Sequence, residues 1–156
     1  MAEQSVFLLV EDNENDIVLV RRAFSEAQLV NPLVVVKNGE EAMAYFMGIG
    51  AYKNRSEFPL PSLVLLDLKL PGMSGIDFLK WLREQPGMKT TRVVVLTSSN
   101  LSKDVNEAYQ AGANSFLVKP TDFEMFVQVT SALSGYWIWT DKPPETERPP
   151  GTRKQD

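Results

Sequence analysis

LVLLDLKLPGMSG, residues 63–75, joins a short apolar run to an acid, a tight turn and the start of a helix. Four consecutive apolar residues, 63–66, are typical of a strand that is buried on both faces of a parallel sheet. Asp67 follows at the carboxyl end of that strand. A Pro-Gly pair then turns the chain, and Ser74 is a suitable N-cap for a helix over 75–84. Strand, turn and helix in this order are the first half of a βαβ unit.

An acid at the carboxyl end of a parallel strand has two interpretations. In open α/β sheets, ligands bind outside the carboxyl ends of the strands, so Asp67 is placed where a functional site is expected. Asp also commonly stabilises the turn that follows a strand. This stretch alone does not decide between the two, and the other strand ends have to be considered.

The composition limits the kinds of site that the chain can form. A length of 156 residues is enough for one domain with a full core. The net charge of −4 argues against a protein that chiefly binds nucleic acid or an anionic membrane. The chain contains no His and no Cys, which excludes an ordinary zinc site, a Ser-His-Asp triad, a Cys nucleophile and disulfides. Without Cys, a membrane-length apolar run or a signal-peptide start, the chain is predicted to be cytoplasmic.

Five apolar runs alternate with five helical patterns. The strands are predicted at residues 6–10, 33–36, 63–66, 92–96 and 115–118. The helices are predicted from residues 13–15 to Phe24, over 40–47 and 75–84, from a cap at 100–102 to Gly112, and over 121–136. Strands that alternate with helices pair in parallel through right-handed crossovers, so the sequence predicts a three-layer α/β sandwich.

Two segments stand outside this alternation. Residues 48–62 form a connection longer than the usual few residues and predict a surface loop. Residues 141–156 carry four prolines among charged and small residues. Such a segment buries too little apolar surface to fold, so we predict one domain over residues 1–140 and a disordered tail over 141–156.

Polar side chains suited to chemistry stand at the ends of four strands. Glu11 and Asp12 follow the first strand, Asp67 the third, Thr97 the fourth and Lys119 the fifth. The carboxyl ends of parallel strands share one edge, so these groups are expected to converge on one pocket. Three carboxylates about 5 Å apart repel by about 3 kcal/mol per pair at an effective dielectric constant of about 20. The pocket therefore requires a cation.

Oxygen ligands favour a hard ion, Mg²⁺ or Mn²⁺, which keeps open positions for phosphoryl oxygens. Asp12 and Asp67 are the best placed ligands, and the main-chain carbonyl of Lys69 is a candidate third. Glu11 is expected to act mainly through water. We predict Mg²⁺ as the cofactor.

A phosphoryl group fits the remaining polar groups of the pocket. Lys119 offers a fixed positive charge and Thr97 a hydrogen-bond donor, and together with the metal they neutralise the phosphoryl oxygens. Asp67 then becomes the nucleophile that forms an acyl phosphate. Enzymes that use an aspartyl phosphate on small molecules usually place a second Asp two residues later, where this chain has Lys69. A module that is never phosphorylated is disfavoured because the set of acids, Thr97 and Lys119 is complete.

The sequence resembles the receiver domains of bacterial two-component response regulators over residues 5–139. Any one of the matching motifs is weak, but together they are specific. They are the Glu11-Asp12 pair after the first strand, Asp67 in LLDLKLPGMSG, Thr97 in VVVLTSS, and Lys119-Pro120 after FLV.

The resemblance implies a flavodoxin-like (βα)5 fold with the parallel sheet order 2-1-3-4-5. It implies that Asp67 is the phosphoacceptor, with Mg²⁺ at Asp12, Asp67 and the Lys69 carbonyl, and that a cis peptide precedes Pro120. It also implies that Phe116 occupies the aromatic switch position, which turns inward as Thr97 moves toward the phosphoryl group.

A looser resemblance points to the regulators associated with bacterial and cyanobacterial phytochromes. It rests on the EDNENDI opening, the long 48–62 connection and the aromatic ending Tyr136–Trp139. It implies a sensor histidine kinase, of phytochrome type, as partner, and output by phosphorylation-dependent protein interaction or phosphorelay rather than a separate enzyme activity. It further implies a homodimer formed by the fourth helix, the fifth strand, the fifth helix and Tyr136–Trp139. The alternative is that these aromatic rings fold back onto their own core.

Overall fold

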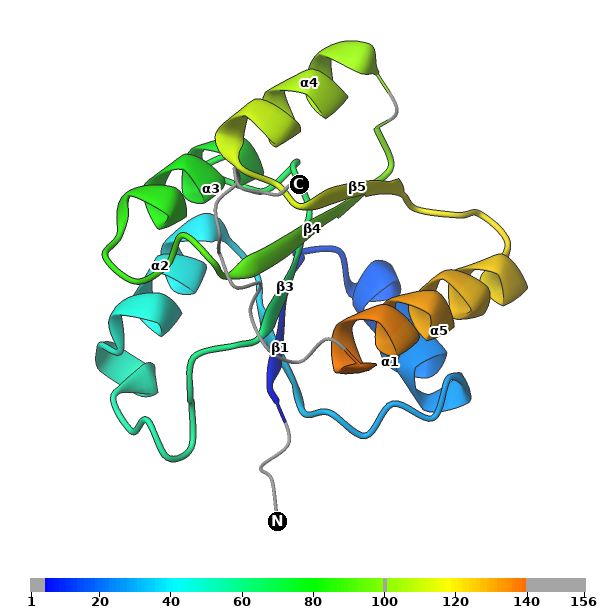
Figure 1. The fold of residues 1–156 in the computed structure, drawn as a ribbon, viewed down its shortest axis with the longest axis horizontal. Helices are drawn as coiled ribbons and strands as arrows, with labels where there is room; N and C mark the ends of the chain where they lie inside the picture. Colours follow the sequence, from blue (N-terminus) through cyan, green and yellow to red (C-terminus); the bar gives the residue numbers. More distant parts are fainter. Residues whose placement is uncertain (1–4, 100, 140–156) are drawn as a thin grey trace, which may run out of the picture.

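Figure 1 shows a parallel sheet of five strands with helices on both of its faces. The computed structural model describes residues 5–99 and 101–139, with the backbone alone for 133–139. The strands are β1 (Phe7–Val10), β2 (Leu33–Val36), β3 (Leu63–Leu66), β4 (Arg92–Thr97) and β5 (Ser115–Val118). The helices are α1 (Glu14–Glu26), α2 (Gly39–Met47), α3 (Gly75–Glu84), α4 (Ser102–Ala111) and α5 (Phe123–Trp139), with a short 3-10 turn, η1 (Gly50–Tyr52).

The strand order is β2-β1-β3-β4-β5, and every neighbouring pair is parallel, as predicted. The three inner strands β1, β3 and β4 are buried along their whole length, whereas the edge strands β2 and β5 are mostly half-buried. Burial on both faces explains why the inner strands are continuous apolar runs rather than alternating ones. The predicted three-layer α/β fold is confirmed.

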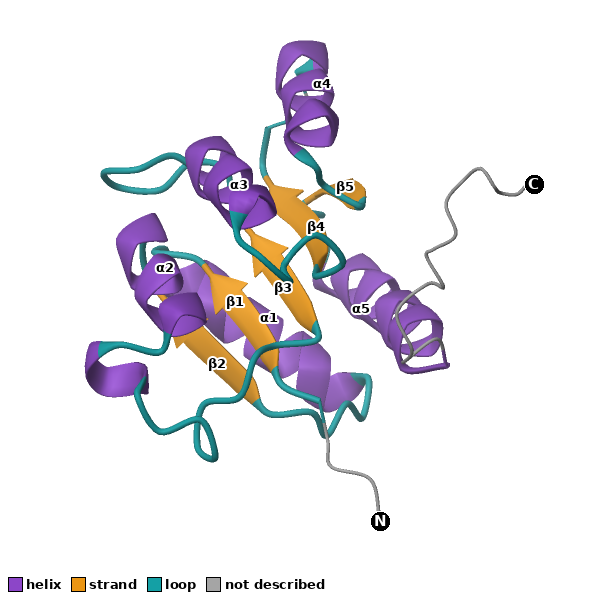
Figure 2. Cartoon of the chain, turned by 60° about the vertical axis from the view of Figure 1, so that its left-hand side comes forward, coloured by secondary structure: helices purple, strands orange, loops and turns teal. Residues whose placement is uncertain are grey.

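The helices divide into two layers. Helices α1 and α5 pack together on one face of the sheet, and α2, α3 and α4 cover the other face (Figures 1 and 2). Alternate residues of β1 serve the two layers: Leu8 packs with Phe78 and Leu79 of α3, while Phe7 packs with Phe24 of α1. This two-sided core fixes the positions of the strand ends.

The helix starts follow from capping. The side chains of Asn13, Asn38 and Ser74 accept hydrogen bonds from backbone N–H groups in the first turns of α1, α2 and α3. The prediction that residues 100–102 supply a side-chain cap for the fourth helix is wrong for the described part of that segment. The N-cap of α4 is Leu101, whose apolar side chain cannot accept a hydrogen bond. The hydroxyl of Ser99 instead accepts from the Leu101 N–H at 3.4 Å.

The long connection between α2 and β3 is packed against the domain. The buried Tyr45 ring lies 5.0 Å from the ring of Tyr52, between centroids, and its hydroxyl donates to the carbonyl of Pro59 at 2.7 Å. Arg55 donates to the carbonyls of Phe58 and Phe46 at 3.0 Å and 2.6 Å. The predicted surface loop therefore has an aromatic core of its own.

Three further expectations differ from the structure or fall outside it. The expected cis peptide before Pro120 is wrong, because the described residues contain no cis peptide bond; the trans form is the lower-energy one for X–Pro bonds by about 0.5–1 kcal/mol. The last helix begins at Phe123 and extends to Trp139, rather than spanning 121–136.

The predicted tail, 141–156, lies outside the described residues. In the described part of the chain, no helix is both long and apolar enough to cross a membrane.

Candidate functional site

The carboxyl ends of four strands bring the predicted site residues to one edge of the sheet. Val10 and Leu66 are paired in the register of β1 and β3, so the acids that follow them, Glu11 and Asp67, stand side by side. The Asp67 N–H donates to the Val10 carbonyl at 3.1 Å, which fixes the backbone of the acid. On the other side, the Lys119 N–H donates to the Thr97 carbonyl at 2.7 Å. The sheet therefore converges these residues as the sequence predicts.

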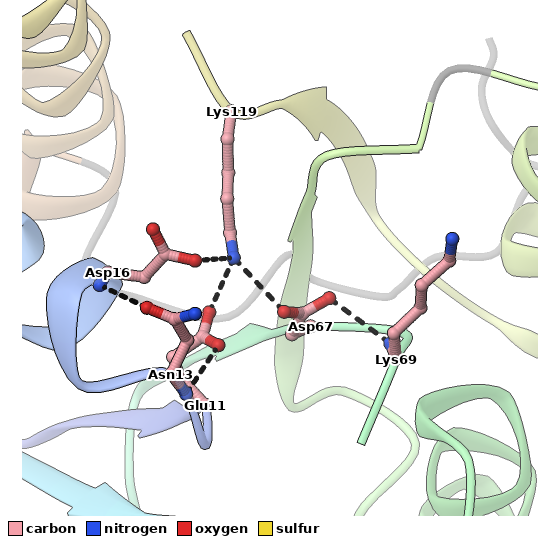
Figure 3. Close-up of polar contacts among 6 residues, drawn as sticks. All are labelled: Glu11, Asn13, Asp16, Asp67, Lys69 and Lys119. Carbon is pink, nitrogen blue, oxygen red and sulfur yellow. Dashed lines mark hydrogen bonds and ion pairs between the residues drawn. The ribbon is translucent and has the colours of Figure 1, made fainter. Parts of the chain in front are cut away.

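The ammonium group of Lys119 is the centre of the site (Figure 3). Its Nζ lies 2.6 Å from Glu11 Oε1, 2.7 Å from Asp16 Oδ2 and 3.0 Å from Asp67 Oδ2. An ammonium has three N–H donors, and these three carboxylates use all of them. One cation thus links the ends of β1, β3 and β5 to the first turn of α1.

Asp16 is a member of this cluster that the sequence analysis did not identify. It lies in the first turn of α1, and its backbone N–H donates to the Asn13 side chain at 2.9 Å. The sequence did contain a signal, since an N-cap Asn followed three residues later by an acid places that acid beside the preceding strand end. The capping bond sets the start of α1, and the start of α1 determines where Asp16 reaches.

Asp67 is held from both sides. The backbone N–H of Lys69 donates to Asp67 Oδ1 at 3.2 Å, while the Lys69 side chain is exposed and extends away from the carboxylate (Figure 3). Gly75 closes against the Asp67 backbone: a Cβ at Gly75 would lie 2.4 Å from the Asp67 carbonyl oxygen. Only glycine fits at this position. The close contact between the start of α3 and the Asp67 backbone therefore helps to fix the position of Asp67.

Burial decides the pKa of Glu11, whereas the neighbouring carboxylates decide that of Lys119. Loss of solvent raises the pKa of the Glu11 carboxyl to about 7, although its hydrogen bond with Lys119 opposes the shift. For Lys119, loss of solvent lowers the pKa, but hydrogen bonds to Asp16 and Glu11 and the charge of Asp67 outweigh it and raise the pKa above its ordinary value. Lys119 is therefore a permanent cation in this site.

The side chains of Thr97 and Phe116 make no polar contact with this cluster in the described part of the chain. The Thr97 side chain is fully buried, and its Oγ1 has no hydrogen-bond partner among the described residues. Buried hydroxyl groups are normally paired, so this donor is available to a water molecule or to a group that binds at the site. Phe116 is half-buried in β5 and packs against a small cluster of Leu68, Val95 and Ala108.

The oxygen donors of the site are of the kind that a hard divalent cation binds. Glu11, Asp67 and the Lys69 carbonyl are oxygen ligands of the type that Mg²⁺ and Mn²⁺ prefer, so the residues fit such an ion chemically. Asp12 is exposed and takes part in no hydrogen bond or ion pair of the described residues. In the described ranges, no three acidic side chains are gathered in an arrangement that could hold a metal ion. The Lys119 ammonium supplies a positive charge beside Glu11, Asp16 and Asp67.

Comparisons with known proteins identify the family of this chain. Residues 7–131 match the profile of the response regulator receiver domain. The response regulator Rcp1 of Synechocystis is 33% identical over 135 residues, which is 86% of this chain and 90% of Rcp1. A crystal structure of Rcp1 in its Mn²⁺-bound form superposes with a TM-score of 0.79 at 32% identity, covering 90% of this chain and 99% of that one.

Two further solved structures are similar along most of their length. The phosphorylated cyanobacterial phytochrome response regulator RcpA gives a TM-score of 0.82 at 32% identity, covering 91% of this chain and 99% of RcpA. The bacteriophytochrome response regulator RtBRR gives a TM-score of 0.73 at 35% identity, covering 91% of this chain and 85% of RtBRR. A Mn²⁺-bound relative is consistent with a divalent metal at the site, whereas the choice of Mg²⁺ stays a prediction.

Proposed function

This chain belongs to the response regulator receiver family, and from that premise we propose that Asp67 is the residue on which it carries a phosphoryl group. The observation that supports this most directly is the pairing of Asp67 with Lys119 at the carboxyl edge of the sheet, with Nζ 3.0 Å from Oδ2. A fixed cation beside a carboxylate is what an acyl phosphate requires when its oxygens gain negative charge. The orphan hydroxyl of Thr97 is a further donor for the same group.

The transfer starts from a phosphohistidine of the kinase. An Asp67 carboxylate oxygen attacks the phosphorus, an O–P bond forms, the P–N bond breaks, and the imidazole nitrogen keeps the electron pair and takes up a proton. The 156 residues contain no His, so the donor imidazole lies outside this sequence. Thr97 and Lys119 donate to phosphoryl oxygens in the product, and Phe116 follows Thr97 as the aromatic switch.

We assign Mg²⁺ as the cofactor. Asp12, Asp67 and the Lys69 carbonyl would hold it, with Glu11 acting through water. When bound, the ion supplies positive charge to the phosphoryl oxygens. Because Asp12 is exposed, it is free to turn toward an incoming ion without breaking a bond to another described residue.

The partner is a sensor histidine kinase, which we propose to be of the phytochrome type because RcpA and RtBRR are phytochrome response regulators. Output then runs through phosphorylation-dependent protein interaction or phosphorelay in the cytoplasm, without nucleic acid and without a separate enzyme activity. The receiver domain occupies 1–140 and the tail 141–156.

We further propose a homodimer through α4, β5 and α5. Large apolar side chains are exposed along this region, and such side chains support an interface. They are Leu101, Tyr109, Val118 and Met125. The side chains of Tyr136–Trp139, which were predicted to take part, lie outside the described residues. Sedimentation at high micromolar concentration, with and without phosphorylation, tests this; a monomer under both conditions would overturn it.

Self-phosphorylation tests the central proposal. The protein is incubated with acetyl phosphate and Mg²⁺, and the intact mass is compared with that of Asp67→Asn and of a sample with chelator. We expect a phosphoryl-sized gain in the wild type alone, removed by hydroxylamine, which cleaves acyl phosphates but not phosphate esters. A gain in Asp67→Asn, or a gain that resists hydroxylamine, would assign the phosphoryl group to another residue.

A further inference from the structure

The contact between Asp16 and Lys119 extends the site into α1. It is an ion pair of 2.7 Å between residues 103 positions apart in the chain. Together with the 2.6 Å contact to Glu11, it places the ammonium closer to the two acids beside α1 than to Asp67, at 3.0 Å. Asp16 therefore draws Lys119 toward α1.

We propose that Asp16 is a positioning residue that competes with the phosphoryl group for the Lys119 ammonium, and that its charge disfavours the phosphorylated state. The inference rests on the proposed function, because it concerns the same phosphoryl group. Asp16 contributes no atom to the reaction and acts through Lys119 alone.

The three carboxylates around Lys119 differ in what they lose when the ammonium moves. The Glu11 side chain is 2% exposed, so release from Lys119 leaves a charge without water around it. The Asp16 side chain is 30% exposed and is hydrated when it is released. Asp67 changes chemically, because its oxygen joins the phosphorus. Asp16 is thus the acceptor that most easily gives up its share of the ammonium.

The charges of the site lead to the same conclusion. An acyl phosphate replaces the single negative charge of Asp67 with a phosphoryl group of higher negative charge. That group faces the one ammonium that Asp16 shares, and like charges near one cation repel. Removing the charge of Asp16 leaves Lys119 more available and lowers this repulsion.

Asp16→Asn removes the charge and keeps the side-chain shape. Asp77 offers a matched control, because Asp77 and Asp16 occupy equivalent positions: each backbone N–H donates to the N-cap side chain of its helix, at 3.1 Å to Ser74 and 2.9 Å to Asn13. Asp77 is exposed and forms no ion pair with another described residue. Asp77→Asn therefore reproduces the loss of a first-turn acid without the loss of a Lys119 contact.

Phosphoryl uptake from acetyl phosphate and phosphoryl loss after donor removal are measured at saturating Mg²⁺, so that a change in metal affinity does not enter. For a partly exposed ion pair we expect the ratio of the uptake to the loss rate constant to rise by about two- to fivefold in Asp16→Asn. Asp77→Asn should leave the ratio unchanged, and Asp16→Glu, which restores the charge, should return it to the wild-type value.

Equilibrium binding of beryllium fluoride, a phosphoryl mimic, provides a readout without turnover. Its affinity for Asp16→Asn should likewise rise, by about two- to fivefold. An unchanged or lower affinity, or equal behaviour of Asp16→Asn and Asp16→Glu, would overturn the competition. A wild type that takes up no phosphoryl group would instead overturn the proposed function, so the two failures are distinguishable.

Discussion

Thr97→Val separates the folding of this domain from its phosphorylation. Thr97 is fully buried in β4, and its hydroxyl has no partner among the described residues. Valine replaces that hydroxyl with a methyl group of nearly the same shape, and β-branched side chains suit a strand. We expect the unphosphorylated protein to become more stable, although a residue of the site has been removed.

The size of the change in the free energy of unfolding follows from the missing hydrogen bond of the Thr97 hydroxyl. A buried polar group without a partner costs about 1–3 kcal/mol, and replacing it with an apolar group of the same shape recovers part of this. We expect the free energy of unfolding to rise by about 1 kcal/mol, which raises the melting temperature by about 2–4 °C in a domain of this length.

Thr130 provides the matched control. It is 3% exposed, and its hydroxyl donates to the Phe126 carbonyl at 2.9 Å, so Thr130→Val removes a hydrogen bond that exists. We expect the free energy of unfolding to fall by about 1 kcal/mol in that variant. The same chemical change at two buried threonines therefore gives opposite signs.

Urea unfolding of the wild type, Thr97→Val and Thr130→Val in the presence of a chelator measures both effects. The phosphorylated state is expected to respond in the opposite sense: a hydrogen bond to a charged oxygen is worth about 1.5–3 kcal/mol, so Thr97→Val should lower the ratio of phosphoryl uptake to phosphoryl loss about tenfold or more. A loss of more than about 1 kcal/mol of stability in unphosphorylated Thr97→Val would refute the reasoning, because it would mean that the hydroxyl is already satisfied.

Three other perturbations test contacts within the domain and the charge of the site. Gly75→Ala should destabilise the protein by about 1–3 kcal/mol and weaken phosphorylation, since the new Cβ would lie 2.4 Å from the Asp67 carbonyl oxygen; urea unfolding and intact mass report the two effects. Arg83→Met should lower the free energy of unfolding by about 3 kcal/mol in urea unfolding, because the guanidinium donates to the carbonyls of Gly112 at 2.7 Å and Thr91 at 2.7 Å. With a chelator present, the free energy of unfolding of the wild type should fall as the pH rises from 4.5 to about 7, by up to about 3 kcal/mol relative to Glu11→Gln. The reason is that the pKa of Glu11 is raised in the folded state. In this pH range the folded protein keeps a proton that the unfolded protein has lost.

Each of these expectations has an outcome that contradicts it. Lys80→Met removes an exposed cation from the same helix as Arg83 and should be nearly neutral, so equal losses in the two variants would show that charge, not carbonyl binding, matters. Parallel pH curves for wild type and Glu11→Gln would mean that Glu11 does not titrate in this range. Unchanged phosphorylation in Gly75→Ala would show that the Asp67 backbone tolerates displacement.

The strands were predictable because each of them is a short apolar run in the sequence, whereas their order in the sheet was implied by the resemblance to receiver domains. Burial on both faces forces β1, β3 and β4 to be continuous apolar runs, and that pattern is visible without a structure. The fourth helix start was less accessible, because Leu101 gives no capping signal and the hydrogen bond comes from Ser99 in the preceding loop. A helix start that depends on the hydroxyl of a loop residue two positions before the N-cap is not visible in the helix propensity of the segment.

The site residues also differ in how far the sequence predicts their positions. Glu11, Asp67 and Lys119 directly follow strands and Thr97 ends one, so strand order alone brings them together. Asp16 stands on a helix, and its contact with Lys119 depends on where α1 begins and on how it turns over the sheet edge. The positions of Asp16 and Lys119 in the sequence give no indication that the two residues meet. The Asn13 cap does indicate where α1 begins, and therefore part of what places Asp16 at the site.

If Asp67 carries the phosphoryl group as proposed, the two donors Thr97 and Lys119 contribute differently to the switch. Thr97 has no acceptor among the described residues, so a phosphoryl oxygen adds a hydrogen bond there without removing another. Each donor of Lys119 already reaches a carboxylate, so a bond from Lys119 to a phosphoryl oxygen replaces an existing one and its net contribution is smaller. The free energy that favours the phosphorylated state therefore depends strongly on the Thr97 hydroxyl, and Asp16 sets how much of the Lys119 charge remains available. A switch built in this way can be tuned through Asp16 without altering any group that touches the phosphoryl oxygens.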